Sequence, residues 1–194
     1  MKVMFDYFFA IVGLFVSLPL LIIIGISIKL TSKGPIFYTQ ERIGRNGIIF
    51  TIIKFRSMTT EHGDNNTITV GGDLRITSLG RFLRKYKLDE LPELLNILKG
   101  EMSFVGPRPD LPGYADKLRG ETRKILALKP GITSQASLKY ANEEEILAKQ
   151  DDPINYNNEV IYPDKIKMNL DYYYNHNLWI DIKIIFATIF RMSY

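Results

Sequence analysis

The fold is decided by the stretch Tyr7-Phe-Phe-Ala-Ile-Val-Gly-Leu-Phe-Val-Ser-Leu-Pro-Leu-Leu-Ile-Ile-Ile-Gly-Ile-Ser-Ile28, a run of 22 residues without a charged side chain. A straight helix of that length is about 33 Å long, enough to cross the apolar core of a bilayer. A cleaved signal peptide fits less well, because the apolar region is too long and no small-residue cleavage site precedes Lys29. The sequence therefore predicts attachment to a membrane through residues 1–30.

A proline interrupts this apolar segment. Pro19 has no N–H to donate and clashes with the carbonyl one turn earlier, and the hydroxyl of Ser17 is close enough to bond to freed backbone groups. Basic residues flank the segment, Lys2 before it and Lys29 after it, and the positive-inside rule places both in the cytoplasm. Two interpretations stay open: a straight transmembrane helix, and a re-entrant helix-break-helix that turns back near Ser17 and Pro19.

The composition of the whole chain narrows the chemistry. Its 194 residues include 25 Lys and Arg against 21 Asp and Glu, two histidines and no cysteine. A disulfide scaffold, a thiolate metal site and a cysteine nucleophile are excluded, and the two histidines are too far apart in sequence for a histidine-rich metal cluster. Residues 29–87 carry 11 basic and 4 acidic side chains, whereas residues 88–194 carry 13 and 16. This separation of charge suits a basic surface beside lipid headgroups.

The pattern after the apolar segment predicts a small β-hairpin and a series of helices. Residues 36–40 and 48–55 read as strands around an Arg45-Asn46-Gly47 turn, and residues 61–73 as a mobile loop. Helices are expected at 74–87, 89–99, 115–129, 141–149 and 178–190, the last as an interfacial or core helix. We expect an α+β, mostly helical fold with amphipathic interfacial helices, divided into a membrane segment (1–30) and a catalytic domain (31–194).

The helix expected at 74–87 is basic and amphipathic. Arg75, Arg81 and Arg84 alternate there with apolar side chains. Such a helix is typical of a contact with a membrane surface or a polyanion, and the alternative is a solvated basic face on a core helix.

Asp89 and Glu90 follow this basic cluster directly. An acidic N-cap and first helical turn, with Pro92 where its missing N–H costs little, would explain both residues without any catalysis. Adjacent carboxylates behind a row of cations can also hold a divalent metal with a polyphosphate, and a carboxylate can attack phosphorus directly. Both interpretations stay open on spacing alone.

Two further patterns point to phosphate. Arg108 lies between Pro107 and Pro109, which fix the backbone and lower the entropy cost of presenting a guanidinium group. Lys54 and Arg56 fall on one face of the expected strand and would clamp phosphates. The alternatives are a surface turn for Arg108 and a solvent-facing strand edge for the other pair.

Seven motifs follow one another along nearly the whole chain: Gln40-Glu-Arg-Ile-Gly44, Lys54-Phe-Arg-Ser-Met58, Asp73-Leu-Arg-Ile-Thr77, Leu88-Asp-Glu-Leu-Pro92, Asn96-Ile-Leu-Lys-Gly100, Met102-Ser-Phe-Val-Gly-Pro-Arg-Pro109 and Lys129-Pro-Gly-Ile-Thr133. In this order they resemble the bacterial sugar transferases, the monotopic polyprenyl-phosphate phosphoglycosyl transferases. The chain looks like the minimal catalytic form of that family.

The resemblance implies a function and a site. It implies transfer of a sugar 1-phosphate from a UDP-sugar to polyprenyl (undecaprenyl) phosphate, with UMP released, as a first membrane step of glycan assembly. Asp89 would attack the β-phosphorus and hold Mg²⁺. Glu90 would assist the placement of Mg²⁺ or the deprotonation of the acceptor, and Arg108 would contact the nucleotide. The re-entrant helix would break near Ser17 and Pro19. The enzyme would lie on the cytoplasmic face of the bacterial inner membrane, as a homodimer or a monomer, and would supply downstream glycosyltransferases.

The sequence departs from the family pattern after Thr133. Residues 134–145 read Ser-Gln-Ala-Ser-Leu-Lys-Tyr-Ala-Asn-Glu-Glu-Glu, and residues 151–164 look inserted, which affects sugar recognition rather than phosphoryl chemistry. The alternative function is a non-catalytic, membrane-anchored basic adaptor. Nucleic acid is not an expected partner, because nucleic-acid binding would leave the apolar segment and the acidic pair unexplained.

Overall fold

The protein is described by a computed structural model that covers residues 1–59 and 75–190. The fold is α+β and mostly helical, as expected. The mobile loop expected at 61–73 lies outside the described residues. The elements are α1 (Lys2–Thr31), β1 (Phe37–Ile43), η1 (Arg45–Gly47), β2 (Ile49–Phe55), α2 (Ser78–Tyr86), η2 (Leu88–Glu93), α3 (Leu94–Leu98), β3 (Ser103–Val105), η3 (Ala115–Lys117), η4 (Gly120–Ala127), β4 (Gly131–Thr133), α4 (Gln135–Lys139), α5 (Glu143–Leu147), α6 (Pro153–Tyr156), η5 (Asn157–Ile161), α7 (Tyr162–Asn175) and α8 (Leu178–Phe190).

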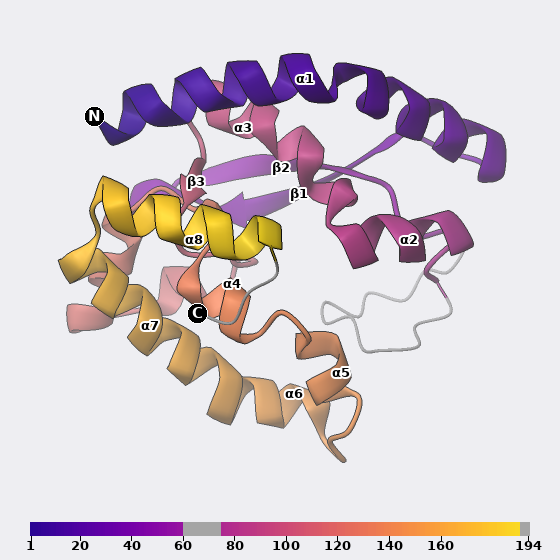
Figure 1. Ribbon diagram of the computed structural model, residues 1–194. Coiled ribbons are helices and arrows are strands. Elements are labelled where there is room, and N and C mark those ends of the chain that lie inside the picture. Colours follow the sequence, from indigo (N-terminus) through magenta and orange to yellow (C-terminus); the bar gives the residue numbers. More distant parts are fainter. Residues whose placement is uncertain (60–74, 191–194) are drawn as a thin grey trace.

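The apolar segment forms one long helix, α1, which arches along one edge of the molecule (Figure 1). The expected break in the helix is wrong, because α1 continues from Lys2 to Thr31 with Pro19 inside it. The hydroxyl of Ser17 lies 3.5 Å from the carbonyl oxygen of Leu14. Neighbouring turns and a hydroxyl can absorb a proline within a helix, so Pro19 does not end α1.

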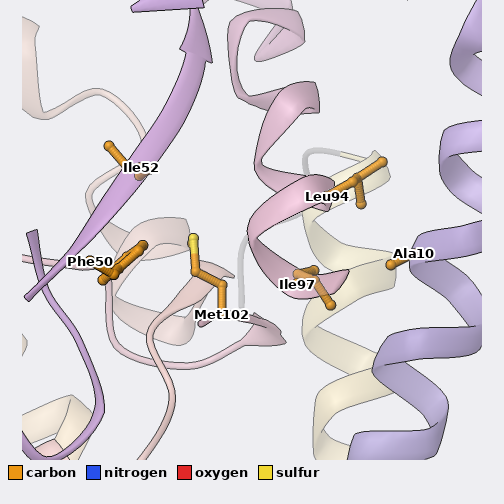
Figure 2. Packing of buried hydrophobic residues seen from close by; sticks show 6 residues of the cluster. All are labelled: Ala10, Phe50, Ile52, Leu94, Ile97 and Met102. Atoms are coloured by element: carbon orange, nitrogen blue, oxygen red, sulfur yellow. The ribbon is translucent and has the colours of Figure 1, made fainter. Parts of the chain in front are cut away.

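One face of α1 packs on the rest of the protein. Ala10 meets α3, β2 and Met102 in a buried cluster of six side chains, which Figure 2 shows from close by: Ala10, Phe50, Ile52, Leu94, Ile97 and Met102. Further along the helix, Ile24 and Ile28 pack with Phe55 and Leu83 of β2 and α2. These positions recur at helical spacing, so they form one stripe that faces the protein interior.

Polar contacts hold both ends of α1. At the first turns, Lys2 Nζ lies 2.6 Å from Asp181 Oδ2, and the buried Asp6 carboxylate accepts hydrogen bonds from Ser103 Oγ (2.9 Å) and the Phe104 N–H (3.2 Å). At the far end, Arg56 donates to the carbonyl oxygen of Ser32 (2.9 Å). Both ends of the helix are therefore fastened to the same folded body.

The two small sheets carry the site. β1 and β2 form the expected antiparallel hairpin, with Phe37 opposite Phe55 and Ile43 opposite Ile49. β3 and β4 are parallel, with Ser103 opposite Gly131. Just after β3, the backbone at Gly106 passes very close to the backbone at Lys129. A Cβ atom on Gly106 would lie 2.2 Å from the Lys129 carbonyl oxygen, so only glycine fits there. This crossing fixes the backbone that leads into residues 107–109.

Candidate active site

The acidic pair lies in a tight turn between α2 and α3. The side chain of Thr77 caps α2, and Lys87 adopts the left-handed conformation (φ 57°) that ends it and starts the 3₁₀ helix η2. The helix expected at 89–99 is present, but its first half is the 3₁₀ helix η2 and only Leu94–Leu98 are α-helical. Asp89 is not an N-cap residue, as that interpretation would require, but lies inside η2. Both Asp89 and Glu90 are buried (8% and 6% exposed).

Glu90 is held by two cations from different parts of the chain. Its Oε1 lies 2.9 Å from Lys54 Nζ on β2 and 2.8 Å from an Arg108 guanidinium nitrogen. Arg108 and Lys54 outweigh the effect of burial and hold the pKa of Glu90 well below its usual range. The site therefore keeps Glu90 charged.

Asp89 has the opposite environment. Burial and the negative charge of Glu90 raise the pKa of Asp89, against smaller contributions from Lys54, Lys87 and Arg84. Its buried Oδ1 has no hydrogen-bond partner among residues 1–59 and 75–190. A buried carboxylate oxygen without a partner is costly in a folded protein, and such atoms cluster where a substrate or an ion completes the contacts.

Arg108 projects from a buried, proline-flanked backbone segment, as the sequence predicts. Pro107 and Pro109 are buried, whereas the Arg108 side chain is 45% exposed. The Pro107 carbonyl accepts the Gly131 N–H (2.9 Å), and the Pro109 carbonyl accepts a hydrogen bond from Arg42 (3.3 Å). The guanidinium thus reaches Glu90 on one side and open space on the other.

The other predicted cations lie elsewhere. β2 ends at Phe55, so Arg56 is not on the strand face with Lys54 but is buried at the end of α1, where it binds the carbonyls of Ser32 and Lys33. Arg84 is paired with Glu144 of α5. Arg81 is exposed on α2, and the Arg75 carbonyl accepts the Thr59 N–H (2.8 Å).

Two residues of the site were not predicted as functional. Glu93 is 2% exposed, and its Oε1 lies 3.0 Å from Lys54 Nζ. Asn96 is fully buried and ties α3 to β2, because it accepts the Ile53 N–H (3.1 Å) and donates to the Thr51 carbonyl (2.7 Å). No pattern in the sequence singles out either residue, because a polar side chain on an amphipathic helix ordinarily faces solvent.

The described residues fit a Mg²⁺ ion that takes few of its ligands from the protein. Within the described ranges, no group of three or more His, Asp or Glu side chains is gathered to hold an ion. Mg²⁺ is normally bound by one or two carboxylates, with substrate phosphates and water as the other ligands. Asp89, with its unpartnered oxygen, fits that role.

Comparison with known proteins gives this arrangement its family context. A family model described as "Bacterial sugar transferase" matches residues 1–194. The UDP-glucose:undecaprenyl-phosphate glucose-1-phosphate transferase of Klebsiella pneumoniae is 36% identical over 178 residues, which are 89% of this chain and 36% of that protein.

Two other relatives carry different sugar names. The UDP-N-acetylgalactosamine-undecaprenyl-phosphate N-acetylgalactosaminephosphotransferase of Aeromonas hydrophila is 34% identical over 192 residues, 95% of this chain and 41% of that protein. A Bacillus subtilis protein named as a putative undecaprenyl-phosphate N-acetylgalactosaminyl 1-phosphate transferase is 40% identical over 135 residues, 69% and 72% of the two chains. The matched region is thus well under half of the Klebsiella and Aeromonas proteins.

Proposed function

Because the chain belongs to the bacterial sugar transferase family, we propose that it transfers a sugar 1-phosphate from a UDP-sugar to polyprenyl phosphate. The products are UMP and a polyprenyl-diphosphate-sugar. The names of the relatives support undecaprenyl phosphate as acceptor and either a hexose or an N-acetylhexosamine as the sugar. The product is the substrate of downstream glycosyltransferases in the assembly of a surface glycan.

The observation that carries this proposal is the contrast between the two adjacent carboxylates. Glu90 is occupied by Lys54 and Arg108, whereas Asp89 keeps a buried oxygen without a partner among the described residues. A nucleophile needs an electron-rich oxygen with an available lone pair, and two cations bound to Glu90 Oε1 draw charge from that carboxylate and lower its reactivity. Asp89 is therefore the nucleophile, and Glu90 organises the cations around it.

The reaction runs in two displacements. In the first, an Asp89 carboxylate oxygen forms a bond to the β-phosphorus, the bond from that phosphorus to the bridging oxygen breaks, and UMP leaves with the electron pair. In the second, a phosphate oxygen of the polyprenyl phosphate attacks the same phosphorus, and the bond to Asp89 breaks. Asp89 is restored as a carboxylate, so the two steps balance.

The cations of the site bind and orient the donor. Arg108 has the exposed, planar donor group that suits a phosphate, and its link to Glu90 fixes its direction. Lys54 lies between Glu90 and Glu93, where it adds positive charge beside the attacking group. Mg²⁺, when held by Asp89 and the diphosphate, supplies charge neutralisation of the leaving group.

Membrane attachment places this chemistry at a lipid surface. Of the described residues, Lys2–Thr31 form the one helix that is long and apolar enough to cross a membrane. Because both ends of α1 are fastened to the same body, we place both at the cytoplasmic face of the inner membrane, with the exposed apolar side of α1 in one leaflet. Both ends of the segment then lie on the same side of the membrane, as in a re-entrant segment, although α1 itself is unbroken.

The replacement of Asp89 by asparagine tests the proposal. Membranes with the wild-type chain should release UMP from one member of a UDP-sugar panel, and mass spectrometry of the first half-reaction should find a phosphosugar on the peptide that contains Asp89. Asp89→Asn should lose both signals and stay in the membrane fraction. Turnover by the variant would contradict the nucleophile assignment.

A matched control separates catalysis from folding. Asp171 is exposed on α7 and accepts a hydrogen bond from Asn175, so Asp171→Asn makes the same chemical change at a surface position and should keep wild-type activity. A wild-type chain that binds membranes but releases no UMP from any donor would favour the adaptor function instead.

A further inference from the structure

Strand β1 carries two side chains that neither step of the proposed reaction uses. Residues that oppose each other in an antiparallel pair have their side chains on the same face of the sheet. Tyr38 opposes Lys54, and Gln40 opposes Ile52, whose side chain is buried in the core. Tyr38 and Gln40 therefore lie on the face of the hairpin from which Lys54 reaches Glu90.

Arg42 joins this face of β1 to the segment that presents Arg108. Its guanidinium group donates to the Pro109 carbonyl oxygen (3.3 Å) and to Gln40 Oε1 (2.5 Å). Gln40 is thereby linked, through Arg42, to the segment whose arginine is proposed to bind the donor phosphates. A group next to those phosphates in the donor would meet this part of β1.

The contact with Arg42 also fixes the orientation of the Gln40 amide. A guanidinium group has N–H donors and no acceptor, so the amide oxygen must face it and the amide nitrogen must point away. That nitrogen has no protein partner among residues 1–59 and 75–190, and it is not buried. Gln40 therefore presents N–H donors, rather than an acceptor, to a ligand.

Tyr38 provides a flat, open surface on the same face. It is 44% exposed, although the side chain of the opposing Lys54 is only 15% exposed. Phe37, on the other face of β1, is equally exposed but stacks on Phe55 with 5.5 Å between the ring centroids. The Tyr38 ring has no aromatic partner in the described part of the chain, so it is free to stack on the flat ring of a ligand.

We propose that Tyr38 and Gln40 bind the uracil base of the donor, with the Tyr38 ring stacked on the base and the Gln40 amide nitrogen donating to uracil O4. The inference rests on the proposed function for the identity of the nucleotide and adds the residues that select its base. Uracil carries a carbonyl acceptor at this position, whereas cytosine carries an amino donor. An amide whose oxygen is held by Arg42 accepts the first and rejects the second.

Equilibrium binding of UMP to the purified full chain in detergent tests the stacking contact without turnover. Tyr38→Leu removes the ring and should weaken UMP binding by about tenfold, whereas Tyr38→Phe keeps the ring and should stay within about twofold of the wild type. Phe37→Leu makes a similar change on the opposite face of the same strand and should bind UMP like the wild type. Thermal unfolding of each variant checks that it is folded.

Comparison of UMP with CMP tests the hydrogen bond. The wild type should prefer UMP by about tenfold. Gln40→Glu keeps the shape of the side chain but replaces the donors by acceptors, so it should weaken UMP binding and abolish the preference over CMP. Thr39→Glu introduces the same charge at an exposed position on the other face of β1 and should keep the preference.

The outcomes separate this inference from the proposed reaction. A Tyr38→Leu variant that binds UMP normally but has a higher KM for the UDP-sugar would place Tyr38 beside the sugar and overturn the inference. Normal UMP binding and base preference in both Tyr38→Leu and Gln40→Glu would also overturn it, while UMP release by the wild type would leave the proposed reaction standing. A wild-type chain that binds no uridine nucleotide would overturn both.

Discussion

Three carboxylates within five residues have different proton affinities. Arg108 and Lys54 keep Glu90 charged, whereas burial raises the pKa of Asp89 and raises that of Glu93 to about 7. Opposite shifts within one turn are typical of sites where one group reacts and another organises. At the scale of the residue, the site depends on which carboxylate receives which cation.

The raised pKa of Glu93 predicts a pH-dependent difference in stability. The folded state binds its proton more tightly than the unfolded state, so this residue costs stability as the pH rises from about 4.5 through 7. Glu93→Gln should match the wild type near pH 4 and be more stable by about 1–3 kcal/mol at pH 8. Thermal unfolding in detergent across this range measures the difference. A constant difference at all pH values would contradict the raised pKa.

At the scale of the element, α1 and β3 act together. Asp6 on the second turn of α1 accepts hydrogen bonds from Ser103 and Phe104 of β3, and β3 leads directly into residues 106–108. The helix that meets the membrane is thereby joined to the strand that presents Arg108. The packing of Tyr172 and Ile184 against Val105 supports the same strand from the other side.

Asp6→Ala should weaken this junction. The substitution leaves a buried hydroxyl and a backbone N–H without their acceptor, which costs about 2 kcal/mol. For a chain of this length we expect a melting temperature lower by about 6 °C and a higher KM for the UDP-sugar. Asp171→Ala, at an exposed position, is the control. An unchanged melting temperature would show that β3 does not depend on α1.

The elements that the sequence predicts well are those with a local cause. The hairpin at 37–55 follows from two runs that contain β-branched and aromatic residues on either side of Asn46-Gly47. The exposed side chain of Arg108 follows from the two prolines that fix its backbone. Helix α2 begins at Ser78 instead of Leu74, because Thr77 provides the cap. Arg56 was assigned to the wrong surroundings, since strand alternation was extended one residue past the end of β2.

Glu93 shows why part of the site could not be predicted. In a 3₁₀ helix, residues three apart lie one above the other, so η2 places Glu90 and Glu93 on the same side, where Lys54 reaches both. An α-helix over 89–99, which the sequence favours, would separate them by 60° around the axis, since each residue turns by about 100°. In the structure, η2 follows the left-handed Lys87 (φ 57°) and contains the buried Pro92.

At the scale of the whole molecule, α1 has two different sides. The stripe that includes Ala10, Ile24 and Ile28 is buried, and the opposite side exposes large apolar residues, among them Phe8, Ile11, Phe15, Val16, Ile22 and Ile23. An exposed apolar surface of this extent marks contact with lipid or protein. Helix α1 lies along one edge of the molecule, and both of its ends are bonded to the folded body (Figure 1). This position suits insertion of the exposed apolar side into one leaflet.

The topology is open to a direct test, because the chain contains no cysteine. Single cysteines introduced as Val3→Cys and Lys33→Cys lie just before and just after the apolar run. In intact cells, an impermeant maleimide should label neither position, and both should react after the cells are opened. Labelling of Val3→Cys from the periplasm would contradict the re-entrant proposal and support a straight span.

The contacts of Lys2 at the start of α1 also bear on the order in which the protein folds during synthesis. Synthesis begins at the N-terminus, so α1 leaves the ribosome before β2, β3 and α8 exist. The helix must be sheltered by lipid or a chaperone during this interval, since its buried stripe has nothing to pack against. Lys2 Nζ can reach the Val105 carbonyl oxygen (3.0 Å) once β3 has formed, and its ion pair to Asp181 follows when α8 packs in place.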